Sequence, residues 1–214
     1  MAIRLTFILL FLGHYLLEGQ TIIVNDTDFS KGRLGYKQEV SLSDLEKFHG
    51  HMCDGLVEGF LALQLGLQEL YPDGVVDRTN TRVITKSSPC LTDAAIYLTG
   101  GRTQYNSFYI DNSISGLFII QRLDTGKALE ISRRPNVKPQ KIDVMGNQAI
   151  RNELDPCALE ELKRMEEEYS EFLLTNSPQN LFEIVEIPHF DWLPKFESYL
   201  KTDVLNKHQK PCEH

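Results

Sequence analysis

Two histidines and a cysteine lie within five residues of one another, in the segment His49-Gly50-His51-Met52-Cys53. Imidazole nitrogens and thiolate sulfurs are ligands that zinc and its neighbouring transition metals prefer. If the segment is extended, all three side chains project to one side; if it is helical, His49 and Cys53 share a face and His51 points elsewhere. The sequence leaves both conformations open, and the density of ligands predicts a metal site.

A second segment of the same chemical character follows later in the chain, in Pro89-Cys90-Leu91-Thr92-Asp93. It places a thiol just before a predicted helix and a carboxylate in the first turn of that helix. The positive end of the helix dipole favours the thiolate, which is the form that a metal ligand or a nucleophile requires. We therefore predict that the sulfurs of Cys53 and Cys90 converge on one metal ion with a ring nitrogen of His49 or His51, and zinc is the first candidate.

Several functions fit this set of residues. In the first, His51, Cys53 and Cys90 hold the metal, a fourth position takes water or a small-molecule substrate, and His49 or Asp93 acts as general base. Asp93 could instead orient a histidine ligand. A closed site with four protein ligands would indicate a non-catalytic metal-binding or metal-carrier module. A cysteine nucleophile activated by His51 without metal, or simple burial of both thiols, are further interpretations. Whether the protein is an enzyme stays open, and no substrate is indicated.

The remaining cysteines, Cys157 and Cys212, have no histidine or aspartate motif around them. We do not expect them at the metal site. In an oxidising compartment the two could form one disulfide.

The acidic balance of the chain argues against nucleic-acid partners. The formal net charge is -8 and the isoelectric point is near 5.3, whereas nucleic-acid affinity depends mainly on lysines and arginines that neutralise phosphates. A basic cluster interrupts this trend, and we interpret it as a solvated loop. Its members are Arg133, Arg134, Lys138 and Lys141.

The first residues differ in kind from the rest. Arg4 precedes an apolar run from Leu5 to Leu17, which is typical of a signal peptide, so residues 1–19 are expected to direct the protein to the periplasm or outside the cell. The run is too short to cross a hydrocarbon core of ~30 Å as a helix. No integral membrane contact is expected.

The pattern of the mature chain alternates helices and strands. Residues 20–42 are polar and are expected to form a linker, and Ser43 with Glu46 form a predicted capping box for a helix that runs toward Phe48. A leucine-rich helix is predicted over Gly55–Leu70 and a charged helix from Pro156 to Thr175. The other predicted elements are a helix over Asp93–Thr99 and strands over Arg82–Lys86, Phe108–Asp111, Leu117–Leu123, Leu129–Arg133 and Leu181–Ile187. The turn Asp124-Thr125-Gly126-Lys127 predicts that two of these strands form a hairpin.

Three motifs in this order resemble the FmdE family, which takes its name from formylmethanofuran dehydrogenase. They are Phe48 to Gly55, Cys90-x-x-Asp93 and Asp124-Thr125-Gly126-Lys127-Ala128, and the resemblance covers roughly residues 42–135. It implies a single-domain α+β fold, with a small antiparallel or mixed sheet packed against helices, that tends to form a homodimer. It also implies a bound metal such as zinc, surrounded by the matching residues His49, His51, Cys53, Cys90 and Asp93.

The resemblance also sets the expected organisation. Residues 43–135 are predicted to form the metal-binding core, and residues 136–214 a helical and C-terminal extension that packs on it. The chain departs from the family pattern at Asp54, where proline is usual, and at Gly101, where cysteine is common. It carries no iron–sulfur cysteine pattern, so the dehydrogenase activity in the family's name is not transferred to it.

Overall fold

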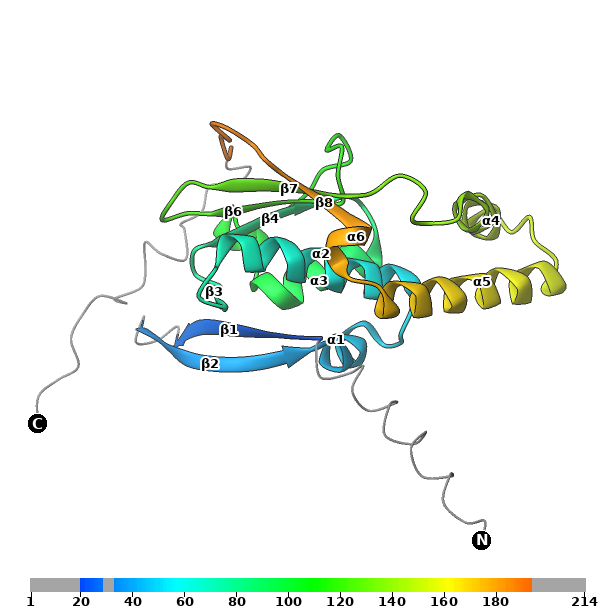
Figure 1. The fold of residues 1–214 in the computed structure, drawn as a ribbon, viewed down its shortest axis with the longest axis horizontal. Helices are drawn as coiled ribbons and strands as arrows, with labels where there is room; N and C mark the ends of the chain where they lie inside the picture. The colour runs from blue at the N-terminus through cyan, green and yellow to red at the C-terminus, as the bar shows by residue number, and fades with distance from the viewer. Residues whose placement is uncertain (1–19, 29–32, 194–214) are drawn as a thin grey trace, which may run out of the picture.

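The computed structural model describes residues 20–28 and 33–193, and these form an α+β fold. Two helices lie between two sheets, and a long helical arm extends to one side (Figure 1). The central helices are α2 (Asp54–Leu70) and α3 (Pro89–Thr99). The predicted fold class is confirmed.

The smaller sheet has three strands in the order β2-β1-β3. β1 (Thr21–Asp28) and β2 (Arg33–Ser41) are antiparallel, and β3 (Val75–Asp77) pairs parallel with β1. The expectation of a linker over residues 20–42 was wrong. Ile22 and Val24 are buried while Ile23 between them is exposed, so an alternating strand pattern lies within a segment whose polar content suggested a linker.

The larger sheet has five strands in the order β5-β4-β6-β7-β8. Only β4 and β5 pair in parallel, and β6 and β7 form the predicted hairpin. The bounds are Thr81–Thr85 for β4, Phe108–Ile110 for β5, Phe118–Arg122 for β6, Ala128–Arg133 for β7 and Phe182–Glu186 for β8. Each strand lies where the sequence predicted one, within one or two residues at either end.

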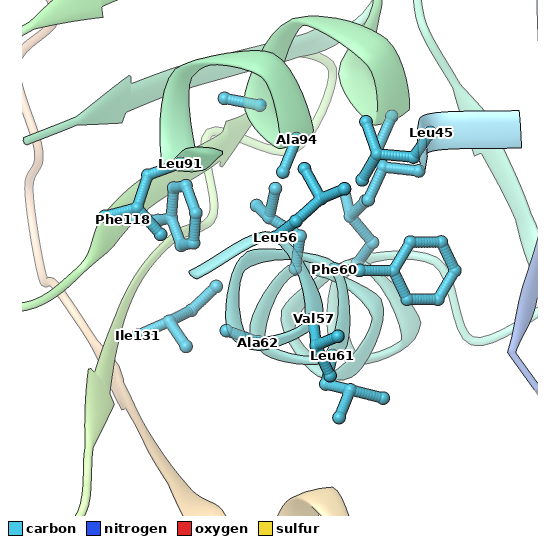
Figure 2. Packing of buried hydrophobic residues seen from close by; sticks show 14 of the residues in the cluster. Leu45, Leu56, Val57, Phe60, Leu61, Ala62, Leu91, Ala94, Phe118 and Ile131 are labelled. Carbon is cyan, nitrogen blue, oxygen red and sulfur yellow. The ribbon is translucent and has the colours of Figure 1, made fainter. Parts of the chain in front are cut away.

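Helix α2 is buried on nearly all sides because it packs against β6 and β7 of the larger sheet and against its helical neighbours (Figure 2). Phe60, Leu63 and Leu67 are inaccessible to solvent. Gly66 lets the helix approach the larger sheet, since a Cβ at this position would overlap the Ile131 side chain. This packing holds the N-terminus of α2 firmly in place.

The first helix, α1 (Leu42–His49), begins earlier than the sequence suggested. The capping box is made by Ser41 and Asp44, not by Ser43 and Glu46: the Ser41 hydroxyl accepts from the Asp44 backbone N–H, and the Asp44 carboxylate accepts from the Ser41 backbone N–H. β2 runs directly into this cap, so no linker separates strand and helix.

The extension contains α4 (Gln140–Ile150), α5 (Pro156–Thr175) and the short α6 (Pro178–Leu181). Of these three helices, only α5 was predicted from the sequence. α5 packs on α2, and α4 packs on α5. Among the described residues, no helix combines the length and apolar character that a membrane crossing would need.

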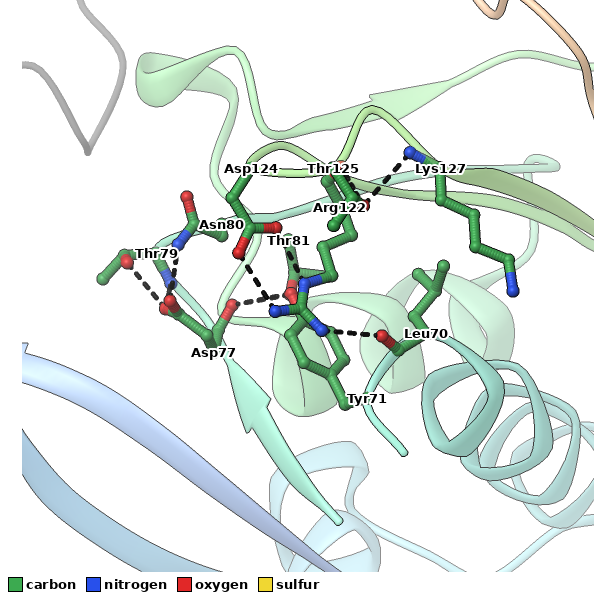
Figure 3. Close-up of polar contacts among 10 residues, drawn as sticks. All are labelled: Leu70, Tyr71, Asp77, Thr79, Asn80, Thr81, Arg122, Asp124, Thr125 and Lys127. Atoms are coloured by element: carbon green, nitrogen blue, oxygen red, sulfur yellow. Dashed lines mark hydrogen bonds and ion pairs between the residues drawn. The ribbon is translucent and has the colours of Figure 1, made fainter. Parts of the chain in front are cut away.

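The third motif of the resemblance has a structural role in this fold. Asp124 binds the Arg122 guanidinium through two contacts of 2.7 and 3.0 Å, and the same guanidinium donates to the Leu70 carbonyl at the end of α2 (Figure 3). Gly126 supplies the positive φ of +75° that the turn needs. The motif thus locks the β6–β7 hairpin to α2 and carries no metal ligand.

Candidate metal centre

Three helix ends meet where the chemistry-bearing motifs lie. α1 ends at His49, and Gly50 follows with a φ of +102°, which turns the chain away from the helix axis. Cys53 then adopts an extended conformation as the residue before α2. Cys90 is the second residue of α3, which begins earlier than the sequence predicted. His49 and Cys53 therefore approach each other across a turn.

Gly55 allows α2 and α3 to approach closely at this point. A Cβ at this position would lie 3.1 Å from both the Cβ and the Sγ of Cys90. That separation is tighter than ordinary van der Waals contact, so a side chain would push the two helix starts apart. The absence of one brings the two thiols together.

The sulfur atoms of Cys53 and Cys90 are 3.4 Å apart, and the Cys53 sulfur is 3.8 Å from Nε2 of His49. Bond lengths to zinc of about 2.3 Å for sulfur and 2.0–2.1 Å for nitrogen, at tetrahedral angles, require separations of about 3.8 Å and 3.6 Å. Both measured distances differ from these by a few tenths of an ångström. These two separations fit a tetrahedral transition metal, and the predicted convergence of the two sulfurs is confirmed.

Asp93 fixes the orientation of His49. Its Oδ2 lies 2.7 Å from Nδ1 of the imidazole, whose side chain is only 6% exposed. A carboxylate that accepts from one ring nitrogen leaves the other as the lone-pair donor. The nitrogen left over is Nε2, which is the atom beside the Cys53 sulfur.

His51 lies next to these groups but is exposed. Its ring centroid is 4.8 Å from that of His49, and one donor atom each of His49, His51 and Cys53 can be chosen so that all three lie within 4.8 Å of one another. The structure therefore brings His49, His51 and Cys53 together, and hydrogen bonds link Asp93 to His49 and Cys90 to Cys53. The His49 side chain is buried beside the Cys53 sulfur, whereas His51 is exposed.

The hydrogen bond between the two thiols shifts their pKa values in opposite directions. The hydrogen bond with Cys90 lowers the pKa of Cys53 to about 6, although burial opposes this shift. The same hydrogen bond, with burial, raises the pKa of Cys90 far above its usual range. Burial lowers the pKa of His49, but the hydrogen bond to Asp93 and the nearby Cys53 sulfur outweigh it, so the net shift is upward. The lowered pKa favours the thiolate of Cys53, which is the form that binds a metal.

A network of charged side chains adjoins the thiols and was not anticipated. Lys138 Nζ lies 3.0 Å from Asp54 Oδ2 and 3.2 Å from Asp143 Oδ1, and Asp54 directly follows Cys53. One helical turn on, the buried Glu58 carboxylate binds Arg133 through both of its oxygens. The interpretation of Arg133 and Lys138 as part of a solvated loop was wrong, because both pair with carboxylates of α2.

This network ties the extension to the metal centre. The Tyr169 hydroxyl of α5 lies 3.1 Å from Glu58 Oε1. Burial, with the negative charge of Asp54, raises the pKa of Glu166, which is also on α5. The signal in the sequence was the unusual presence of Asp54 and Glu58 at the start of an otherwise apolar helix. Such carboxylates require basic partners from elsewhere in the chain.

The other cysteines stay apart as far as the structure describes them. Cys157 is a free, exposed thiol on α5. Cys212 lies outside the described residues, so the Cys157–Cys212 disulfide stays a prediction. The predicted signal peptide also lies outside them.

Comparisons with known proteins identify the family. Residues 48–183 match the family model described as FmdE, molybdenum formylmethanofuran dehydrogenase operon. A crystal structure of a tungsten formylmethanofuran dehydrogenase FmdE-like protein from Syntrophus aciditrophicus is similar, with 13% sequence identity and a TM-score of 0.41, over 69% of this chain and 72% of that chain. No curated protein matches the chain significantly.

The family match begins at Phe48, beside the first ligand motif, and ends in β8. It therefore includes both thiols, both histidines and Asp93, and it continues through α4 and α5, beyond the residue 135 at which the predicted core ends. Since it spans well over half of the 214 residues, the chain belongs to the FmdE family.

Proposed function

We propose that the protein binds one transition-metal ion through Cys53, Cys90 and His49, with zinc as the first candidate. The observation that carries this proposal is the 3.4 Å separation of the two sulfurs beside the Nε2 of a histidine whose other nitrogen is held by Asp93. Two thiolates and an imidazole are borderline-soft donors of the kind that zinc prefers. Met52 is partly exposed next to this centre, so the site is near the surface.

The geometry supports an exchange of roles between the two histidines. His51 was the ligand and His49 the general base in the assignment from sequence, but the buried imidazole beside the thiols is that of His49. Asp93 then acts as the orienting group for that ligand, which was the alternative given for it. His51 is exposed, its ring lies beside that of His49, and it is the candidate for a fourth ligand or for a proton-transfer group.

Two functions follow from what His51 does. With three protein ligands and a water molecule, the metal would act as a Lewis acid and would lower the pKa of that water, and His51 would be the residue that exchanges a proton with a bound substrate. With His51 as fourth ligand the site is closed and serves storage, transport or structure. The exposure of His51 favours the first, and its short distance to His49 and Cys53 favours the second.

Metal analysis under reducing conditions tests the proposal. The wild-type chain is expected to retain about one metal ion, whereas Cys53→Ser, Cys90→Ser and His49→Ala lose most of it. Cys157→Ser is the matched control, because it removes an exposed thiol on α5. Metal retention in all three site variants would refute the proposal.

Cobalt substitution distinguishes the two functions. Visible absorption of the Co²⁺ protein reports its coordination number and its exchangeable ligands. A spectrum that changes when azide or cyanide is added indicates an open position, and in that case His51→Ala changes the starting spectrum little. A closed site gives a spectrum that resists added anions in the wild type and becomes sensitive to them in His51→Ala.

We also propose that residues 1–19 direct export and that the mature chain forms a homodimer. The apolar run after Arg4 supports export. Exposed apolar side chains on α4 and α5, among them Ile150 at 82% exposure, support self-association. The mass of the mature protein after secretion tests the first, and light scattering at several concentrations tests the second.

A further inference from the structure

A cavity lies toward the C-terminal end of α3, away from the thiols at the start of that helix. It has a volume of about 470 Å³, within the range typical of small-molecule sites. Its wall is formed by the smaller sheet, the ends of α1 and α3, and the 3₁₀ turn η1 (Thr103–Tyr105). None of the five candidate metal-site residues lines it.

Its charge is opposite to that of the protein as a whole. The lining contains two arginines, Arg78 and Arg102, and one carboxylate, Asp26. The balance at the cavity is therefore positive in a chain with a formal net charge of -8. A cavity of this sign in an acidic protein favours an anionic ligand.

Arg78 is held in a fixed conformation at this cavity. Its Nε donates to the Leu98 carbonyl at 3.2 Å, and its Nη2 donates to the Tyr97 carbonyl, so the guanidinium caps the C-terminus of α3. The remaining nitrogen, Nη1, is 4.0 Å from Asp26 Oδ2, which is longer than a hydrogen bond. A cation held in this way has donor capacity left for a ligand and loses little conformational freedom on binding.

Aromatic rings form another part of the lining. The Phe48 and Tyr97 rings are 5.3 Å apart with an angle of 32° between their planes, and Tyr105 lines the cavity as well. Phe48 is 51% exposed, so its ring is accessible to a ligand. Rings at the surface beside a guanidinium offer stacking to a planar group and charge to an acid group.

We propose that this cavity binds an organic anion that carries a planar aromatic ring, with the acid group on Arg102 and Arg78 and the ring against Phe48 and Tyr97. The proposal goes beyond the metal centre and does not depend on it. The two sites are nevertheless neighbours, because Phe48 precedes His49 and Tyr97 follows Asp93 by one helical turn.

The test uses calorimetric titration of the full mature chain with 2-naphthoate. Two probes serve as controls: 2-naphthamide, which keeps the ring and loses the charge, and acetate, which keeps the charge and loses the ring. A further titration with 2-naphthyl phosphate shows whether carboxylate or phosphate is the preferred acid group. Naphthoate or naphthyl phosphate is expected to bind at least tenfold more tightly than either control.

Variants locate the binding. Arg102→Gln changes an exposed side chain and is expected to weaken naphthoate binding about tenfold, the loss typical of one charge-assisted hydrogen bond. Tyr97→Leu is expected to weaken it as well. Arg164→Gln, an exposed arginine of α5 that pairs with Glu161, is the matched control and should bind as the wild type does.

A carboxylate could also coordinate a metal, so the titration is repeated with the Cys53→Ser/Cys90→Ser double variant. Unchanged naphthoate binding places the probe in the cavity, whether or not the metal proposal holds. Loss of binding in the double variant, equal binding of naphthamide, or equal affinity of the Arg102→Gln and Arg164→Gln proteins would each overturn the inference.

Discussion

Asp93 is the residue whose removal tests the proposed metal centre most selectively, because it is hydrogen-bonded to the proposed ligand His49. Its carboxylate lies 2.7 Å from Nδ1 of the buried imidazole. Removing such a partner of a metal-bound histidine usually reduces metal affinity by about 10–100-fold. This range corresponds to about 1.4–2.7 kcal/mol of binding free energy.

Two variants separate the contributions of charge and orientation. Asp93→Asn keeps an oxygen that can accept from Nδ1–H but removes the charge, so the affinity for zinc is expected to fall toward the lower end of that range. Asp93→Ala removes both and is expected to reach the upper end. Asp73→Asn, in the exposed turn after α2, is the control.

The assay is a competition titration of reduced, metal-free protein with zinc in the presence of a chromophoric chelator. Circular dichroism and urea unfolding establish that the variants remain folded. If Asp93→Ala binds zinc within threefold of the Asp73→Asn control, then His49 is not a ligand that Asp93 orients, and the assignment of the two histidines must be reversed.

Three further predictions concern stability and reactivity. Glu58→Ala is expected to lower the free energy of unfolding in urea by about 3–5 kcal/mol, because it leaves the Arg133 guanidinium without its buried partner. A change below 1 kcal/mol would show that the ion pair between α2 and β7 contributes little to stability. Gly50→Ala is expected to destabilise the chain by about 1–2 kcal/mol in thermal unfolding, because Gly50 has a φ of +102° that alanine rarely adopts. Gly146→Ala, inside α4 with open space around it, is expected to stabilise the chain by up to about 1 kcal/mol. Equal effects of the two substitutions would show that the positive φ at Gly50 does not cause the loss of stability. In the metal-free protein the alkylation rate of Cys53 by iodoacetamide, followed by peptide mass spectrometry, is expected to rise through a midpoint near pH 6, since a lowered pKa keeps the thiolate present above that pH. A midpoint near the ordinary thiol value of 9 would contradict the effect of the Cys90 hydrogen bond on Cys53.

The elements that the sequence predicted well are those with strong local signals. The leucine-rich helix after Cys53 and the charged helix after Asp155 were placed within a residue or two, because apolar periodicity and the Asp-Pro start are local features. The hairpin of β6 and β7 followed from its turn residues. The approach of Cys53 to Cys90 followed from the chemistry of their motifs.

The failures involve partners that are distant in sequence. β1 and β2 are stabilised by pairing with each other and β1 also pairs with β3, some fifty residues later, so a polar-looking segment became a sheet. Lys138 and Arg133 lie in a basic stretch whose buried acidic partners belong to α2. The arrangement of the two histidines depended on the conformation at Gly50, which the sequence left open.

The central claim is that two thiolates and the His49 imidazole hold one metal ion. X-ray absorption at the metal edge of the zinc-loaded, reduced protein tests it most directly. We expect two sulfur scatterers at about 2.3 Å and one or two nitrogen scatterers at about 2.0–2.1 Å. A spectrum of oxygen and nitrogen ligands alone, or one with a single sulfur scatterer, would contradict the proposed centre.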